Sequence, residues 1–205
     1  MGLVAAHFSQ VLQSQSACQF EKRTMKFGFV ATVATIISTV SAVTGKLGDA
    51  KEVHDNCPRA IFRSFLRSDE VEGIVSFLPT SDGVGLTVVA EFSKLPTDDD
   101  KIMYHIHEKR LEGGSTNCTS TGGHLDPYQR GDEPPAEEGH PERAEVGDLS
   151  GKHGTLSGAP VVVSYVDKYL ANRLDNPAYI GNHSVVVHRS DKTRIACSNI
   201  ELVAW

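Results

Sequence analysis

The sequence has few aromatic residues, few basic residues and no long run of apolar residues. Aromatic side chains make up 7% of the 205 residues, and 20 Lys and Arg are outnumbered by 26 Asp and Glu, which gives a net charge of −6. No basic cluster is present, so we expect no nucleic acid and no anionic membrane surface as a partner. The most apolar stretch, residues 28–40, is too short and too rich in Ser and Thr for a membrane span, so we expect none.

Long amphipathic helical patterns are also absent, whereas short alternations of apolar and polar residues recur. These alternations predict strands at residues 71–78, 86–93, 102–108, 161–166, 184–189 and 194–203. Residues 109–150 are instead dense in Gly, Pro, Asp and Glu, which is typical of a long loop that carries function. Repeated short strands around one long loop predict an all-β sandwich.

Near its N-terminus the sequence has the layout of a secretory signal peptide. A basic residue precedes the apolar stretch, and the small-residue exit Val40-Ser41-Ala42 follows it. We therefore predict a signal peptide at residues 25–42 and a secreted domain at residues 43–205, outside the cell or in the cell wall. Residues 1–24 are an uncertain upstream extension, for which a start of translation at Met25 and a bipartite leader are both open. The last residues lack the pattern of a lipid anchor, so we expect none in this sequence.

Four histidines are the main candidates for a metal site. His105 and His107 are separated by an apolar residue, and in a strand two such side chains point from the same face. A pair of this kind is more often two half-exposed strand histidines than a ligand set. His124 and His188 supply two further imidazoles, and converging neutral imidazoles suit copper(II). The four together therefore favour a copper site.

The cysteines and the glycosylation motifs agree with secretion. Removal of the leader leaves Cys57, Cys118 and Cys197, so one disulfide and one spare thiol is the simplest arrangement in an oxidising compartment. Because Cys118 and Cys197 both lie beside histidine positions, we pair these two and leave Cys57 unassigned. Asn117 and Asn182 each begin an Asn-x-Ser/Thr motif, and we predict glycosylation of both.

The order of these motifs resembles that of the copper-zinc superoxide dismutase family over residues 55–200. The residues that carry the resemblance are His105-Ile106-His107, His124, Gly147-Asp148-Leu149, His188 and Arg194-Ile195-Ala196-Cys197. The resemblance implies a Greek-key, immunoglobulin-like β-sandwich or barrel with one long metal-site loop, one copper per chain and conversion of superoxide to oxygen and hydrogen peroxide. It also implies site roles: copper ligation by His105, His107, His124 and His188, an active-site arginine at Arg194, and an intrasubunit disulfide between Cys118 and Cys197.

The sequence departs from the zinc-containing members of that family in the long loop. Two histidines that bind zinc in those members are replaced here by Asp132 and Glu145, while the shared histidine and aspartate persist. One histidine with three carboxylates is a poor match to the nitrogen and sulfur ligands that zinc prefers, so we do not expect zinc. His140 and His153 lie in or near the loop, but neither occupies a ligand position of the family.

A second departure follows His188. Only five residues, 189–193, separate it from Arg194, where zinc-containing members have a long charged loop. We therefore expect an unusually open copper site. With the leader and the missing zinc ligands, this makes the sequence similar to the extracellular copper-only superoxide dismutases of fungi, many of which carry a lipid anchor.

The resemblance implies that His124 is the ligand that releases the metal and accepts a proton, whereas the other three histidines stay bound. Without zinc, other groups must orient His124, and ligating histidines commonly donate their second N–H to a carboxylate. We predict that Glu145 and Asp148 do this. The alternatives are that Glu145 is a solvated loop acid and that Asp148 is a structural turn residue.

Arg194 is predicted to attract the superoxide anion to an otherwise acidic protein, with a structural surface role near the disulfide as the alternative.

The competing function is a secreted copper-binding β-sandwich without turnover, which would need neither Arg194 nor the two carboxylates. A structural surface sandwich leaves the histidines unexplained. A zinc hydrolase is disfavoured because the nearest acid, Glu108, alternates away from the His105 and His107 pair. We expect a monomer.

Overall fold

The computed structural model describes residues 45–204. The predicted upstream extension, the signal peptide and the first residues of the secreted domain lie outside these residues. The described part contains eight strands and three short helices, namely β1 (Ile61–Arg67), β2 (Glu72–Pro79), β3 (Leu86–Lys94), β4 (Met103–His107), η2 (Cys118–Thr121), η3 (Pro141–Arg143), α2 (Leu149–His153), β5 (Val161–Asp167), β6 (Ser184–His188), β7 (Arg194–Asn199) and β8 (Glu201–Ala204).

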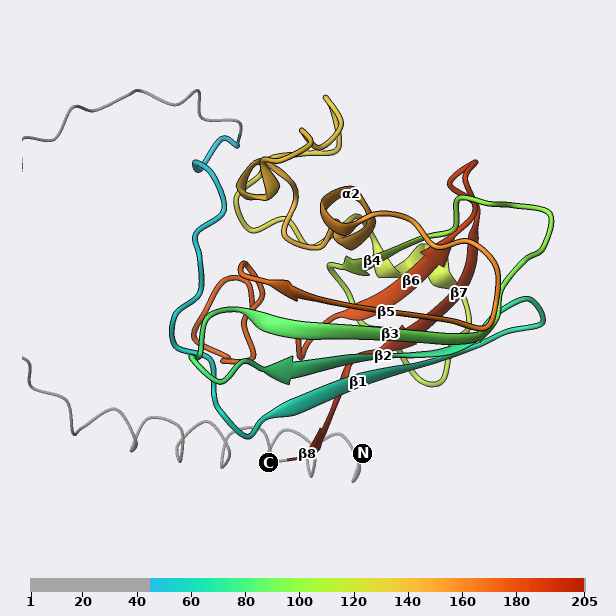
Figure 1. Ribbon diagram of the computed structural model, residues 1–205, viewed down its shortest axis with the longest axis horizontal. Helices are drawn as coiled ribbons and strands as arrows, with labels where there is room; N and C mark the ends of the chain where they lie inside the picture. The colour runs from blue at the N-terminus through green and yellow to red at the C-terminus, as the bar shows by residue number, and fades with distance from the viewer. Residues whose placement is uncertain (1–44, 205) are drawn as a thin grey trace, which may run out of the picture. The chain divides into compact units, whose positions relative to one another are not determined.

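The strands form two antiparallel sheets, as the all-β prediction requires (Figure 1). One sheet has the order β5-β3-β2-β1-β8 and the other the order β4-β6-β7. Every predicted strand is present, but the predicted strand at 194–203 divides at Ile200 into β7 and β8, and β8 pairs with β1 in the other sheet. Strand β1 was not predicted, because its outward Phe65 is 52% exposed and obscures the alternation of apolar and polar residues.

The hydrophobic core lies between the sheets and follows from the strand alternation. In β3, the inward side chains from Leu86 to Phe92 are buried, whereas Glu91 is exposed. On the second sheet, Ile106, Val185 and Val187 are fully buried. Burying a side chain of this size stabilises a fold by about 1.5–3 kcal/mol. The core therefore occupies one face of the β4-β6-β7 sheet and leaves the other face for a site.

The long loop at 109–150 is also observed, and it returns to the free edge of β4. The Leu125 N–H donates to Ile106 O at 2.8 Å, and the Ile106 N–H donates to Gly147 O at 2.9 Å. A Cβ atom on Gly147 would lie 2.2 Å from Ile106 O, so only glycine allows this approach. The loop is thereby joined to β4 on both sides of its exposed middle section.

Helix α2 follows the loop and is anchored to both sheets. The N–H of Tyr104 in β4 donates to the Ser150 hydroxyl at 2.8 Å. Lys152 forms an ion pair of 2.5 Å with Asp167 at the end of β5, and both side chains are buried. His153 binds the same carboxylate at 2.9 Å. These contacts fix the helix that begins immediately after Asp148.

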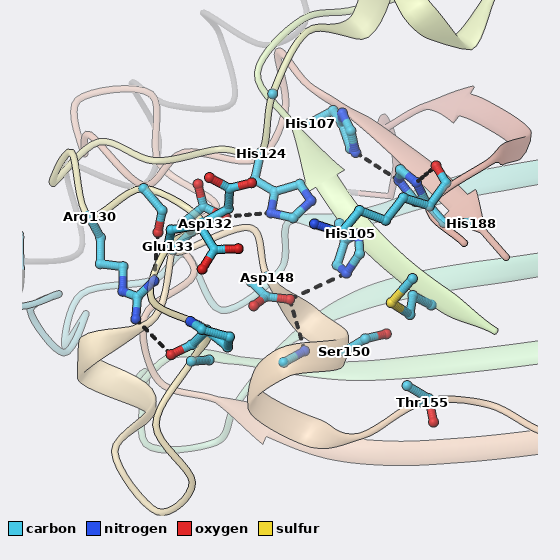
Figure 2. A pocket seen from close by; sticks show the side chains of 18 of the residues that line it. His105, His107, His124, Arg130, Asp132, Glu133, Asp148, Ser150, Thr155 and His188 are labelled. Carbon is cyan, nitrogen blue, oxygen red and sulfur yellow. Dashed lines mark hydrogen bonds and ion pairs between the residues drawn. The ribbon is translucent and has the colours of Figure 1, made fainter. Parts of the chain in front are cut away.

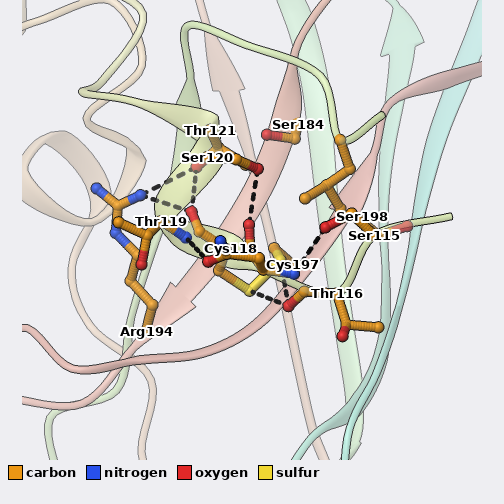
Figure 3. The surroundings of a disulfide bond; sticks show 12 residues. Ser115, Thr116, Cys118, Thr119, Ser120, Thr121, Ser184, Arg194, Cys197 and Ser198 are labelled. Carbon is orange, nitrogen blue, oxygen red and sulfur yellow. Dashed lines mark hydrogen bonds between the residues drawn. A yellow bond between two sulfur atoms is a disulfide. The ribbon is translucent and has the colours of Figure 1, made fainter. Parts of the chain in front are cut away.

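The predicted disulfide between Cys118 and Cys197 is confirmed, and it joins η2 to β7 (Figure 3). Cys57, which the sequence left unassigned, is disulfide-bonded as well. Within residues 45–204, no helix is long and apolar enough to cross a membrane.

Candidate metal centre

Three of the four predicted histidines lie on the outer face of the β4-β6 pair. His105 and His107 alternate with the core residue Ile106, as their spacing predicted. His188 is paired with Met103 in the antiparallel register, and paired residues project from the same face, so it joins them. Hydrogen-bonded backbone therefore sets the positions of these three side chains.

His124 reaches the same place from the long loop. It forms an isolated antiparallel bridge with His107, and the Glu108 N–H donates to Gly123 O at 3.0 Å. The ring centroids of His124 and His105 are 4.2 Å apart. One nitrogen from each of the four histidines lies within 4.8 Å of the others, and Figure 2 shows their rings grouped at one pocket. Sequence analysis predicted this convergence.

Backbone carbonyls orient two of the rings. His107 Nδ1 lies 2.9 Å from Gly122 O, and His188 Nδ1 lies 3.2 Å from Lys192 O. A carbonyl only accepts, so each Nδ1 carries the proton and each Nε2 is left as a ligand atom. The two Nε2 atoms are 3.1 Å apart. Both unprotonated nitrogens therefore face the same point.

Carboxylates orient the other two rings. His124 Nδ1 lies 2.5 Å from Glu145 Oε2, and His105 Nε2 lies 3.3 Å from Asp148 Oδ1. Nδ1 of His105 is buried and has no hydrogen-bond partner. The nitrogens left unprotonated are therefore Nε2 of His124 and Nδ1 of His105.

This donor set fits a copper ion. Burial lowers the pKa of His107 to about 2 and that of His188 to about 4, and it also lowers the pKa of His105. These three imidazoles are therefore neutral at ordinary pH, the state in which histidine binds metal. Four converging imidazole nitrogens suit copper, and the unpartnered Nδ1 of His105 gains a partner when a metal is bound.

The two predicted carboxylates take different positions. Glu145 is buried and bonded to His124, so the alternative of a solvated loop acid is wrong. Asp148 contacts His105 and not His124, which corrects the expectation that both acids orient His124. Burial alone would raise the pKa of Asp148, but hydrogen bonds, the largest of them from His105, outweigh it and lower that pKa to about 2. Asp148 also caps α2 through the Gly151 N–H at 2.8 Å, so its structural turn role is real too.

Arg194 is brought to the site by its pairing with His188 in the register of β6 and β7. Its guanidinium donates to Cys118 O at 2.6 Å and to Gly122 O at 2.7 Å, beside the disulfide (Figure 3). Arg194 also lines a cavity of about 630 Å³ that contains the four histidines. Its position thus agrees both with attraction of an anion to the cavity and with a structural role beside the disulfide.

Among the described residues, those at the zinc positions do not form a metal-binding group, although Glu145 contacts His124. Asp132 is exposed at the wall of the cavity. His140 binds Glu142 at 2.9 Å, and His153 binds Asp167 at 2.9 Å. In the part of the chain that the structure describes, the four histidines are the one cluster able to hold a metal ion.

Sequence reasoning missed two residues that shape the site. Lys192 has a positive φ of 70°, its carbonyl orients His188, and its side chain lines the cavity. Arg130 also lines the cavity and binds loop carbonyls. Neither contact involves an acidic side chain, so no charge pairing in the sequence indicated it.

The predicted glycosylation sites, Asn117 and Asn182, are exposed, and their modification stays a prediction.

Comparisons with known proteins agree with this geometry. Residues 71–200 match the family described as copper/zinc superoxide dismutase. Cell surface superoxide dismutase [Cu-Zn] 4 of Candida albicans is 38% identical over 141 residues, which are 69% of this chain and 58% of that protein. Cell surface Cu-only superoxide dismutase 5 of the same organism is 35% identical over 133 residues, or 65% of this chain and 56% of that protein. The chain thus matches less than two thirds of the length of these relatives.

A solved structure also matches the fold. The structure of Candida albicans superoxide dismutase 5 with Cu(II) has a TM-score of 0.63 and 31% sequence identity, and the match covers 70% of this chain and 92% of that one.

Proposed function

Because this chain belongs to the copper/zinc superoxide dismutase family, we propose that it converts superoxide to oxygen and hydrogen peroxide at a single copper ion. The observation that carries this proposal is the convergence of four histidines whose outer nitrogens are all held by protein acceptors. Relatives named as cell surface dismutases, one of them as copper-only, support it.

His105, His107, His124 and His188 would hold the copper. A bound copper ion supplies the Cu(II)/Cu(I) couple, which takes one electron from a first superoxide and returns it to a second, so that oxygen and, with two protons, hydrogen peroxide are released. The protein contributes ligand geometry, a proton donor and an approach for the anion.

His124 is the proposed proton carrier. Its side chain is 20% exposed, against 7% for His105, so it is the more accessible ring. Glu145 holds the proton at Nδ1 of His124, which leaves Nε2 as the nitrogen that can receive a proton from solvent and pass it to the product. The carboxylate also stabilises the imidazolium that forms when both nitrogens are protonated. Glu145 thus takes the place of a second metal ion at this histidine.

Asp148 is proposed to act differently. It holds the proton at Nε2 of His105, so that the buried Nδ1 of this ring stays available as a ligand atom. Since Asp148 also caps α2, the same carboxylate fixes the helix and the ring. Its contribution is therefore to the copper geometry and not to proton transfer.

The approach of superoxide is assigned to two cations of the cavity. Lys192, within the short turn after His188, and Arg194, directly after that turn, both line it. An oriented positive charge raises the encounter rate of an anion with an otherwise acidic protein. The short turn, Arg189–Thr193, supports the expectation of an open site, because no longer segment joins β6 to β7.

The location of the protein, its oligomeric state and its partners are also proposed. The cell-surface relatives and the disulfide between Cys118 and Cys197 support action outside the cell or in the cell wall. The four-histidine site is complete within one chain, so we propose that a monomer is sufficient for activity. The net charge of −6 gives no support for nucleic acid as a partner. Zinc is not proposed, because Glu145 occupies the outer nitrogen of His124.

Metal analysis joined to a superoxide assay tests the proposal. We would load the secreted domain with copper, count copper and zinc per chain, and measure turnover. One copper, no zinc and fast turnover are expected. Tight copper binding without turnover would instead favour the alternative, a secreted copper-binding sandwich. The Arg194→Ala variant separates these outcomes further, because copper storage has no use for a charge that attracts an anion.

A further inference from the structure

Arg130 joins the two ends of the exposed section of the long loop. Its Nε donates to Arg143 O at 2.7 Å, and one Nη donates to Gly131 O at 2.7 Å and to Pro134 O. The other Nη donates to Pro135 O at 2.9 Å. Four of the five N–H groups of one guanidinium are therefore used on backbone carbonyls of a single loop. Figure 2 shows Arg130 beside Asp132 and Glu133, on the side of the pocket away from His188.

Apart from Arg130, the main cross-link in this loop is the ion pair of Arg143 Nη with Glu137 Oε2 at 3.0 Å, which joins side chains and leaves the carbonyls of residues 131–135 without a donor. Most residues of 131–140 are exposed, so the segment gains little from apolar burial. Pro134 and Pro135 have no N–H group and cannot form a backbone ladder. The one backbone–backbone hydrogen bond recorded among residues 131–140 of the described chain runs from His140 N to Glu137 O. An external donor is therefore needed to order the carbonyls of this segment.

Arg130 is itself well anchored. The Asp126 carboxylate accepts the Arg130 N–H at 3.0 Å and the Gly131 N–H at 2.8 Å. The neighbouring Leu125 is hydrogen-bonded to Ile106 in β4. The guanidinium thus extends from a turn that is fixed to the second sheet. At its far end it reaches Arg143, two residues before the carboxylate that binds His124.

We propose that Arg130 is a positioning residue, whose guanidinium cross-links the loop and thereby holds Glu145 against His124. This inference rests on the proposed function, because Glu145 matters there for the proton on His124. Without this cross-link the exposed segment would be free to move. Glu145 would then be anchored on its C-terminal side by the contact of Gly147 with β4, and on its N-terminal side mainly by the hydrogen bond from Ala50 N to Glu142 O. Arg130 lies on the side of the pocket away from His188, so it is not assigned to substrate attraction.

The proposal requires the planar fork of arginine and not only its charge. A lysine has three donors on a single nitrogen and cannot reach carbonyls that are spread around the guanidinium. Arg130→Lys should therefore behave like Arg130→Ala, although it keeps the charge. Arg67→Ala is the matched control, because Arg67 pairs with exposed Glu72 on the opposite sheet.

The first measurement uses the metal-free protein and a protease that cleaves after glutamate. The loop contains Glu137 and Glu138, which are exposed, unchanged by the substitutions and not followed by proline. Loss of several hydrogen bonds should raise cleavage in this segment by about 10-fold in Arg130→Ala and Arg130→Lys. Arg67→Ala should be cleaved at the wild-type rate. Unchanged cleavage in both Arg130 variants would overturn the cross-link.

The second measurement distinguishes positioning from a merely structural role. In the copper-loaded protein, Arg130→Ala should shift the Cu(II) paramagnetic resonance spectrum and the pH profile of turnover in the same direction as Glu145→Gln, to a smaller extent. In the double variant, loss of Arg130 should add nothing to the effect of Glu145→Gln on either readout. Faster cleavage with an unchanged spectrum and pH profile would refute positioning.

These readouts separate the two proposals. If the wild-type protein binds copper but does not turn over superoxide, the proposed function fails, and the spectrum still decides whether Arg130 acts through Glu145. If Arg130→Ala does not fold, Arg130→Lys carries the same comparison. Additive effects of the Arg130 and Glu145 substitutions on the spectrum would overturn the proposal in either case.

Discussion

The two halves of the metal centre are held in different ways. The strand half, His105, His107 and His188, lies on hydrogen-bonded strands and is almost fully buried. The loop half, His124 and Glu145, lies on a long loop, and a contact between two side chains orients the ring. A strand ladder fixes several residues together, whereas a single side-chain contact can change without disturbing its neighbours. The strand half is therefore suited to holding the metal, and the loop half to proton chemistry.

The largest expected effect concerns the buried ion pairs that join α2, the helix directly after the loop half, to the end of β5. Asp167 binds Lys152 and His153 of α2, and its side chain is fully buried. Breaking a buried ion pair by removing one partner costs about 3–5 kcal/mol. We expect Asp167→Asn to lower the unfolding free energy of the metal-free protein by about this amount in urea. The control Glu91→Gln removes an exposed carboxylate in β3 and should cost far less.

The loss of unfolding free energy in Asp167→Asn should depend on pH. Burial would raise the pKa of Asp167, but Lys152 and His153 outweigh burial and hold the pKa below its ordinary value. The stabilisation is then present above the ordinary carboxyl pKa, about 3.9, and is lost as the pH falls through the lower value of the folded state. The gap between wild type and Asp167→Asn should narrow below about pH 4. A gap that widens on acidification would contradict this account.

The next prediction compares one ligand from each half. His107→Gln should weaken copper binding by about 100-fold or more, because outer partners alone are commonly worth 10- to 100-fold. His124→Gln should weaken it less, since the remaining three nitrogens stay in place on the strands. Copper competition with a chelator measures both. Equal losses would show that the two halves contribute equally to copper binding and would remove the distinction.

Glu145→Gln tests the loop half alone. The variant should bind copper nearly as well as wild type, yet lose turnover by about 10-fold or more towards high pH, where protons are scarce and their relay limits the rate. Asp148→Asn should instead reduce copper affinity, because Asp148 contacts the buried His105. Turnover and copper affinity measured across pH for both variants give the comparison. An unchanged pH profile in Glu145→Gln would remove its role in proton transfer.

The strand half could be predicted from the sequence, because strand alternation places His105 and His107 on one face. Strand β1 could not, since the exposed Phe65 interrupts the pattern. In the loop half, the contact between Glu145 and His124 followed from the need of a ligating histidine for a second acceptor. The contact of Asp148 with His105 did not, because two acids three residues apart give no sign of which ring each one meets.

Arg130 and Lys192 were missed for a related physical reason. Both act on or through backbone carbonyls, which every residue has, so their contacts leave no complementary charge in the sequence. Polar loops of this kind are specified by donors and acceptors of the main chain, whereas strands are specified by side-chain alternation. Sequence patterns therefore describe the strand half more completely than the loop half.

The smallest expected effect concerns Arg194, which belongs to a strand but also binds the loop segment beside the disulfide. Arg194→Ala should slow turnover at low salt by about 10-fold, and the difference should shrink as salt screens the charge. Arg194→Lys separates the two roles, because it keeps the charge and loses the fork that binds Cys118 O and Gly122 O. Recovery of the rate in Arg194→Lys would assign the effect to attraction of superoxide. An equal, salt-independent loss in both variants would assign it to the loop, and Arg194 would then belong with the loop half of the site.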